Sequence, residues 1–251
     1  MHLFDLTGKT AIVTGCNKGL GYGMALALAN AGADIVAVNR TENETLKTAI
    51  EEQGRKFHAV SADLTAITDV DRIIEDAVTA FGHVDILVNN AGAIRRCDSV
   101  DFSEKDWDDV MNVNLKTVFF LSQAFAKQVI KQSTKGKIIN IASMLSFQGG
   151  IRVPSYTASK SGVMGITKAL ANEWASYGIN INAIAPGYMA TDNTAQIRAD
   201  EAREKEILAR IPAGRWGTAE DLAGATIFLA SGASDYVNGT TIAVDGGWLA
   251  R

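Results

Sequence analysis

The chain has few of the residues that form disulfides, interrupt helices or bind metal ions. It contains two cysteines, three prolines and three histidines among 251 residues. Cys16 and Cys97 cannot form a disulfide scaffold, which favours a reduced, cytoplasmic protein. The histidines are scattered and there is no cysteine pair, so we predict no metal site. None of the three prolines lies inside a predicted helix, where proline would break the hydrogen-bond pattern.

Long apolar runs and a basic surplus are also missing. No stretch approaches the ~20 apolar residues that span a bilayer, and the first residues show no leader pattern, so no membrane partner is expected. The net charge of −4 argues against a nucleic-acid partner. Apolar residues are plentiful, at 47% of the chain against 21% charged, which predicts a globular fold with a large core.

Seven short apolar runs alternate with segments whose apolar residues recur at helical spacing. Such runs are typical of strands buried on both faces, and the alternation indicates right-handed crossovers between parallel strands. We therefore predict an α/β fold: one doubly wound Rossmann domain over residues 1–251, with a seven-stranded parallel sheet and helices on both faces. The predicted strands are Thr10–Thr14, Ile35–Asn39, Phe57–Ser61, Ile86–Asn89, Ile138–Ala142, Ile179–Ala185 and Thr240–Val244. The predicted helices are Leu20–Ala31, Thr45–Gln53, Asp69–Phe81, Trp107–Ile130, Tyr156–Tyr177 and Ala219–Ala230.

One segment fits this alternation poorly. Residues 189–216 are rich in charge and weak in strand character. We predict a helical insertion with loops that covers the substrate at the carboxyl edge of the sheet, where ligands bind in such folds.

A glycine-rich segment follows the first predicted strand and opens the first helix. Gly15 suits a tight turn, Gly19 the approach of a pyrophosphate, and Gly21 the close packing of helix on strand. The start of the helix offers free N–H groups to phosphates. A glycine-rich turn without a ligand is the alternative, which the strand before it and the helix after it disfavour.

Three further side chains suggest proton transfer. Tyr156 and Lys160 are four residues apart in a helical pattern and share one face. The pKa of free tyrosine, near ~10, is too high for a base at neutral pH, and a neighbouring ammonium lowers that pKa. The pair is a candidate general acid and base, with a surface pair as the alternative. Ser143 follows a strand at the ligand-binding edge, where a hydroxyl can bond a substrate oxygen. Nearby Ser146 shows that a turn serine needs no such role.

Together these motifs resemble the short-chain dehydrogenase/reductase family over essentially the whole chain. The resemblance implies hydride transfer between a nicotinamide cofactor and a secondary alcohol or ketone. The matching motifs are Thr14-Gly15-x3-Gly19-x-Gly21, Asn89-Asn90-Ala91-Gly92, Ser143 with Tyr156-x3-Lys160, and Pro186-Gly187-x3-Thr191.

The resemblance implies a role for each of these positions. Tyr156 donates or takes the substrate proton, Lys160 lowers the pKa of that tyrosine and binds the nicotinamide ribose, and Ser143 orients the substrate oxygen. Asn114, rather than the nearby Asn112, positions a water for proton relay. The residues implied to bind the cofactor are Gly15, Asn17, Lys18, Gly19, Leu20, Gly21, Asn39, Arg40, Asp63, Leu64, Asn90, Ala91, Gly92, Tyr156, Lys160, Pro186, Gly187, Met189 and Thr191.

Some of these positions have plain structural alternatives. Asp63, matched to an adenine contact, is equally suited to cap a helix. Asn90 can hold the sheet without touching a ligand. Tyr188 and Met189 are expected to flank the nicotinamide or substrate, or to be ordinary packing.

The end of the second strand bears on the choice between NAD and NADP. An acidic residue there bonds the ribose of NAD, whereas an arginine accommodates the 2′-phosphate of NADP. The chain has Asn39 and Arg40 at this point, and Lys18 precedes the second loop glycine. These residues favour NADP(H), unless the basic side chains point into solvent. The family members that the chain most resembles usually use NAD(H), which is therefore the first choice, with NADP(H) second.

Further segments resemble family members that act on a small anionic sugar acid in uronate (pectin) breakdown. A carboxylate calls for a guanidinium partner, ideally a bidentate one. Arg95 and Arg152 are favoured for this contact over Arg96, and Gln148 is a candidate for substrate hydroxyls; the alternative for each is a surface or inter-subunit position. The resemblance also implies a homotetramer. The segments concerned are Arg95-Arg96, Asn140–Tyr156 and Val244–Arg251.

Three other functions stay open at this point. The chain could be a dehydrogenase for another polyol, ketouronate or ketone, a dinucleotide sensor without turnover, or a methyltransferase built on a similar sheet. The intact set of Ser143, Tyr156 and Lys160 counts against the last two. Loss of turnover on replacing Tyr156 by phenylalanine would separate an enzyme from a sensor.

Overall fold

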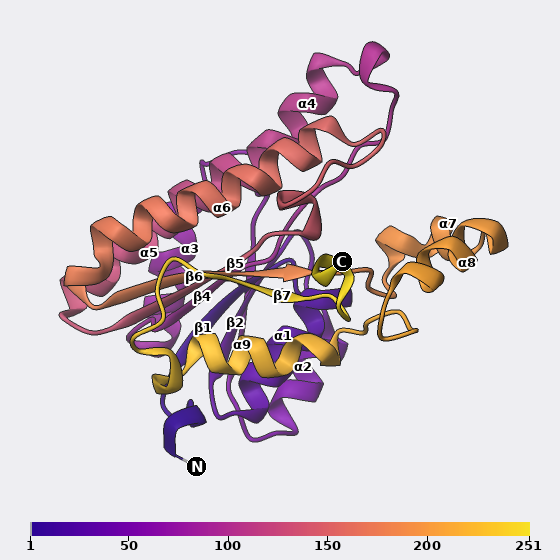
Figure 1. Cartoon of the computed structure of the whole chain (residues 1–251). Helices are drawn as coiled ribbons and strands as arrows, with labels where there is room; N and C mark the ends of the chain where they lie inside the picture. The colour runs from indigo at the N-terminus through magenta and orange to yellow at the C-terminus, as the bar shows by residue number, and fades with distance from the viewer. Residues whose placement is uncertain (1) are drawn as a thin grey trace.

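The computed structural model describes residues 2–251, and its centre is one parallel sheet (Figure 1). The sheet has seven strands in the order β3-β2-β1-β4-β5-β6-β7, which confirms the predicted fold class. Strand β1 pairs with both β2 and β4, so the chain reverses its direction of winding between β1 and β4. The strands are β1 Thr10–Thr14, β2 Asp34–Asn39, β3 Phe57–Ser61, β4 Ile86–Asn89, β5 Gly136–Ile141, β6 Ile179–Pro186 and β7 Thr241–Val244.

Helices cover both faces of the sheet (Figure 1). The first, second and ninth helices pack on one face, and the third, fifth and sixth pack on the other. The helices are α1 Gly19–Asn30, α2 Glu44–Glu51, α3 Val70–Phe81, α4 Glu104–Met111, α5 Thr117–Gln132, α6 Pro154–Trp174, α7 Ala195–Arg198, α8 Glu201–Arg210 and α9 Ala223–Ala230. None of the helices in residues 2–251 is both long enough and apolar enough to cross a membrane.

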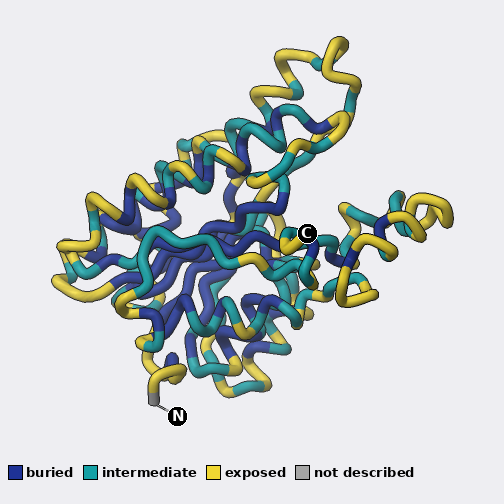
Figure 2. The backbone as a smooth tube through the Cα atoms, viewed as in Figure 1, coloured by how far each residue is buried: buried dark blue, intermediate teal, exposed yellow. Residues whose placement is uncertain are grey.

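The two-sided core follows from the alternation of side chains along each strand. Ala11 and Val13 of β1 join the core beneath α1, while Ile12 between them joins the core beneath α3 and α5. All five residues of β1 are buried, as a continuous apolar run predicts for a central parallel strand. Figure 2 shows the central strands buried and the exposed residues gathered on the outer segments, while the edge strands β3 and β7 are mostly of intermediate burial.

The predicted helix Trp107–Ile130 is wrong as a single element. Helix α4 ends at Met111, a π-helical turn covers Asn112–Lys116, and α5 continues from Thr117. The turn carries Asn114, whose side chain is buried and bonds the backbone of Ala93. A π-helical turn inserts one residue into the helical repeat, which lets a polar side chain turn inward here.

Segments on either side of the carboxyl edge project beyond the sheet. Helix α4 lies on one side, and α7 with α8 lies on the other (Figure 1). The latter two belong to residues 189–216, where the sequence predicted a helical insertion. The carboxyl edge between them is therefore flanked by chain on both sides.

Candidate active site

The glycine loop after β1 is locked to the end of β4, at the point where the winding reverses. The Asn90 side-chain amide donates to the carbonyls of Thr14 and Gly15, both at 2.9 Å. A Cβ on Gly21 would lie 2.4 Å from Asn90 Nδ2, so only glycine leaves room for this contact. Gly15 and Gly19 have φ of +66° and +59°, a region that glycine adopts without strain. The loop thus has the turn that approach of a phosphate requires.

Asn39, the last residue of β2, forms hydrogen bonds with the glycine loop after β1. Asn39 Oδ1 accepts from the Asn17 N–H at 3.2 Å, and Asn39 Nδ2 donates to the Cys16 sulfur at 3.4 Å. The Asn39 side chain therefore supports the loop rather than presenting a carboxylate. Arg40 is exposed beside it, and its charge is one of the causes that lower the pKa of Asp63.

The structure brings Ser143, Tyr156 and Lys160 together at the carboxyl edge. Ser143 follows β5, and its side chain lies close enough to Tyr156 to oppose the rise in the tyrosine pKa. Pro154 begins α6, which places Tyr156 and Lys160 one turn apart near its start. The Lys160 ammonium lies 5.7 Å from the centroid of the Tyr156 ring and donates to the Ile141 carbonyl at 2.6 Å.

The protein alone does not lower the pKa of Tyr156 as the sequence led us to expect. Burial raises the pKa of Tyr156, and the Ser143 hydroxyl and the Arg96 charge oppose this rise only in part. Burial also lowers the pKa of Lys160 to about 8. Burial therefore opposes the charged form of both groups, the phenolate of Tyr156 and the ammonium of Lys160.

The Asn114 side chain forms hydrogen bonds that support the candidate site. Its Oδ1 accepts from Ala93 N at 2.8 Å, and its Nδ2 donates to Ala93 O at 2.9 Å and to Ser159 Oγ at 3.2 Å. Ser159 lies beside Lys160 on α6, so Asn114 connects that helix to the loop after β4. These bonds use both N–H donors of the fully buried Asn114 amide and one of the two acceptor positions of its Oδ1.

Ser146, which we expected to be an ordinary turn serine, connects two of the candidate catalytic residues. Its Oγ accepts from the Ser143 N–H at 3.2 Å and donates to the Lys160 carbonyl at 2.7 Å. The serine turn after β5 is thereby fixed to helix α6. A serine three residues after Ser143, as in an N-terminal capping box, was the available signal.

The two arginines favoured for the substrate carboxylate already have acidic partners. Arg95 pairs with Asp106 at 3.3 Å and Asp109 at 3.4 Å, and Arg152 pairs with Asp98 at 2.9 Å. Arg96, which the sequence ranked behind them, is the one whose charge reaches Tyr156. Its guanidinium donates to the Asn193 carbonyl at 3.1 Å. The ranking made from the sequence did not take these carboxylates into account, because the sequence does not show which of them fold against Arg95 and Arg152.

The loop after β6 approaches the glycine loop. A Cβ on Gly19 would lie 3.8 Å from Thr191 Cγ2, and Lys18 pairs with Asp192 at 2.5 Å. Pro186 ends β6, and a Cβ on Gly187 would lie 2.5 Å from Asp245 Cα, so glycine is required there as well. Met189 is only 4% exposed and packs in the core, as the packing alternative predicted.

The remaining predicted cofactor residues line the approaches to this loop. A Cβ on Gly92 would lie 3.3 Å from Asn114 Oδ1 and 3.8 Å from Lys160 Nζ, which places Ala91 and Gly92 beside the candidate catalytic residues. Leu64 is buried and its carbonyl accepts from Thr117 Oγ1 at 2.9 Å, while Leu20 packs against the core. Asp63 is exposed and accepts from Thr65 N at 3.0 Å. The alternative that Asp63 caps a helix is wrong, because Asp69 precedes α3.

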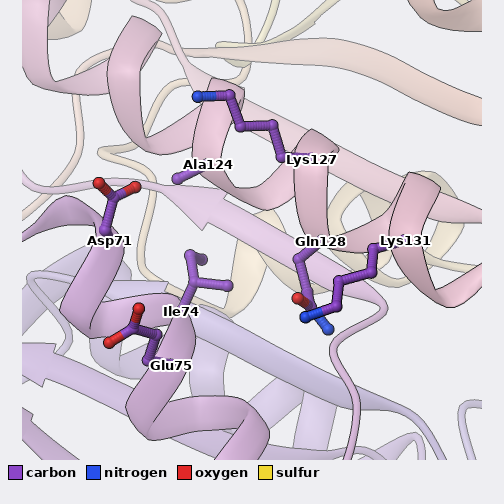
Figure 3. A pocket seen from close by; sticks show the side chains of 7 residues that line it. All are labelled: Asp71, Ile74, Glu75, Ala124, Lys127, Gln128 and Lys131. Atoms are coloured by element: carbon purple, nitrogen blue, oxygen red, sulfur yellow. The ribbon is translucent and has the colours of Figure 1, made fainter.

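A separate hollow lies between the outer sides of α3 and α5 (Figure 3). Acidic side chains of α3 face basic side chains of α5 across it, and none of the candidate catalytic residues lines it. It is therefore unrelated to the site at the strand ends. Its lining residues are Asp71, Ile74, Glu75, Ala124, Lys127, Gln128 and Lys131. Within residues 2–251, no three His, Cys, Asp or Glu side chains group as a metal site would require.

These residues fit a bound dinucleotide. The glycine loop opens a helix at the switch point of the sheet, where such cofactors bind. Hydrogen bonds from Asn90 tie that loop to the residue after β4, and Tyr156 and Lys160 lie near the start of α6. The fold and site thus define a nicotinamide-dependent oxidoreductase. The chain belongs to the short-chain dehydrogenase/reductase family: the model described as enoyl-(acyl carrier protein) reductase matches residues 15–249.

Relatives within the family are similar over their full length. The chain is 66% identical over 251 residues to 2-dehydro-3-deoxy-D-gluconate 5-dehydrogenase of Escherichia coli (strain K12), covering 100% of this chain and 99% of the relative. A structure from Agrobacterium tumefaciens with bound NADP is 56% identical, with a TM-score of 0.94 and 100% of each chain covered. A gluconate 5-dehydrogenase from Burkholderia cenocepacia, solved with NADP and tartrate, is 40% identical, with a TM-score of 0.95; 100% of this chain and 98% of that chain are covered.

Proposed function

We propose that this chain oxidises 2-dehydro-3-deoxy-D-gluconate at C5 to the corresponding 2,5-diketo acid, and catalyses the reverse reduction. The observation that carries the reaction class is the meeting of Ser143, Tyr156 and Lys160 at the strand ends beside the glycine loop. The sugar-acid substrate is supported by the full-length similarity to the Escherichia coli enzyme. The reaction belongs to uronate breakdown, as in pectin degradation.

In the proposed oxidation the substrate loses a hydride from C5 and a proton from the C5 hydroxyl. A nicotinamide held by the glycine loop and Lys160 would supply the hydride acceptor for C5 and positive charge beside the tyrosine. Ser143 donates a hydrogen bond to the C5 oxygen and holds it next to Tyr156. Tyr156 takes the hydroxyl proton, leaving a carbonyl at C5, and returns that proton in the reduction. Lys160 stabilises the phenolate through its charge, and Asn114 and Ser146 keep α6 in place.

A turnover assay tests this function. Purified protein is given 2-dehydro-3-deoxy-D-gluconate with NAD⁺ or NADP⁺, and reduced nicotinamide is followed by its absorbance. We expect turnover with this acid, and a higher kcat/KM than with D-gluconate, the substrate named for the Burkholderia relative. A folded protein that binds the cofactor but turns over neither acid would contradict the substrate, and a panel of other polyols and ketones would follow.

For the cofactor, we propose that NADP(H) is used at least as well as NAD(H), the first choice from the sequence. Asn39 presents no carboxylate, so nothing at the end of β2 repels a 2′-phosphate. Arg40 is exposed at the same point and free of an ion pair among the described residues. NADP in the two related structures supports this choice.

Replacing Arg40 should shift cofactor preference toward NAD. In Arg40→Ala, we expect Kd for NADPH to rise about tenfold, because a charge-assisted bond to the 2′-phosphate is lost, while Kd for NADH stays nearly unchanged. Lys18→Ala is the matched control with a smaller effect, since Asp192 already compensates Lys18. Fluorescence titration of both reduced cofactors measures the ratio, and an equal change for both would contradict the assignment.

The remaining expectations are part of the same proposal. Residues 189–216 cover the substrate, which the projection of α7 and α8 beside the carboxyl edge supports (Figure 1). The links from Lys18 to Asp192 and from Arg96 to Asn193 tie the start of this segment to the site. The cytoplasmic location, the homotetramer and the lack of nucleic-acid, membrane and metal partners rest on the composition and the family resemblance.

A further inference from the structure

An uncompensated arginine lies at the end of α8. Arg210 is exposed, and its guanidinium carbon stacks 4.0 Å from the ring centroid of Trp248. Its Nη2 donates to Gln148 Oε1 at 3.5 Å, and Trp248 Nε1 donates to the same oxygen at 3.3 Å. Among the described residues, these partners are both uncharged. Arg95 and Arg152, by contrast, are held by carboxylates.

The stack fixes the plane of this guanidinium. Trp248 is 4% exposed and packed, so the ring is a rigid support for the planar group. Gln148 accepts from Nη2, and no other residue within 2–251 accepts from the guanidinium N–H groups. A planar fork held in this way binds a carboxylate in bidentate fashion, with little side-chain entropy left to lose. The end of α8 is also fixed, because Arg251 donates to the carbonyls of Ala209 and Arg210 at 3.0 and 2.7 Å.

The same cluster connects Arg210 to the catalytic serine. Met144 follows Ser143 in the chain and packs with Trp248 and with Ile207, which lies one turn before Arg210 on α8. Arg210 and Ser143 thus adjoin the same apolar cluster. Arg96 acts at the other end, where its charge reaches Tyr156 and thus the reacting carbon. A substrate that reacts at C5 and carries its carboxylate at C1 needs a cation at some distance from the reacting carbon.

We propose that Arg210, supported by Trp248 and Gln148, binds the C1 carboxylate of the sugar acid. The proposal rests on the proposed function and adds to it the specificity-determining residue. Arg210 takes the role that the sequence analysis assigned to Arg95 or Arg152, and Gln148 positions it. Residues 248–251 support this subsite, through the ring of Trp248 and the hydrogen bonds of Arg251 to the end of α8.

The test compares the acid with its methyl ester, which differs only at C1. In Arg210→Gln we expect KM for the acid to rise about 10- to 100-fold, with kcat and the kinetics of the ester nearly unchanged. Gln148→Glu should act similarly without removing the arginine, because the new carboxylate neutralises it. Arg203→Gln, on the same helix and paired with Glu206 at 2.8 Å, is the matched control and should change KM less than about twofold. An unchanged preference for the acid in Arg210→Gln overturns the proposal, as does equal loss for the acid and the ester.

A binding measurement separates this inference from the proposed function. D-gluconate is titrated into the protein with NADPH while tryptophan fluorescence is followed. If the wild type fails to turn over 2-dehydro-3-deoxy-D-gluconate but binds gluconate in an Arg210-dependent manner, the substrate is wrong and the subsite stands. If it turns over the acid and Arg210→Gln binds gluconate as tightly as the wild type, the subsite is wrong and the function stands. Absence of both turnover and binding overturns both.

Discussion

In Tyr156→Phe, kcat should fall by a factor on the order of 10² to 10⁴ while cofactor binding is retained. The substitution removes only the hydroxyl that takes the proton from the C5 alcohol. The phenyl ring keeps the packing at the start of α6, and Lys160 still donates to the Ile141 carbonyl. Absorbance assays in both reaction directions measure kcat, and titration with NADPH measures cofactor binding.

Two outcomes would contradict this assignment. Turnover within about tenfold of the wild type would place the proton acceptor elsewhere. Loss of NADPH binding together with turnover would show that the hydroxyl acts in binding. Tyr188→Phe is the control, because that ring packs edge-on against Trp216 and Trp248. A catalytic role also predicts that alcohol oxidation rises with pH, since burial raises the pKa of Tyr156 and the oxidation needs its phenolate.

The strands could be predicted because their signal is local. A central parallel strand such as β1 is apolar throughout, since both of its faces are covered, and the observed Thr10–Thr14 has the predicted limits. The break between α4 and α5 has no such signal. It depends on Asn114 bonding the backbone of Ala93, 21 positions earlier in the chain. Helical periodicity describes a face of a helix and cannot report a contact with a distant loop.

The residues of the candidate site also differ in how far the sequence predicts them. The glycine loop and the Tyr156–Lys160 pair occupy short segments, and sequence spacing is enough to bring each set together. The arginines near the edge share one local pattern but differ in which carboxylate folds against them, as Asp98 does against Arg152. The stack of Arg210 on Trp248 joins residues 38 positions apart, so only the folded chain reveals it.

In Lys160→Met, kcat should fall about 100-fold. With the 5.7 Å between the Lys160 ammonium and the centroid of the Tyr156 ring as the charge separation, and an effective dielectric constant of about 20, the ammonium stabilises the phenolate by about 3 kcal/mol. This corresponds to about two powers of ten in rate. Methionine fills similar space but carries no charge, so the phenolate formed during turnover loses this support. A fall of less than about threefold would show that the ammonium does not act on the tyrosine.

The same substitution should also change how stability depends on pH. Burial lowers the pKa of Lys160 to about 8, against 10.5 for the exposed group. Between these two values the unfolded chain binds a proton that the folded protein does not, so wild-type stability rises with pH across this window. Below about pH 8 the folded protein carries the full penalty of a buried ammonium. Lys160→Met should lack this rise, which denaturant unfolding at pH 7, 8, 9 and 10 measures. An unchanged slope would mean that another group titrates in this range, whereas a flat profile together with lost turnover would show that one buried charge disfavours folding and supports proton transfer.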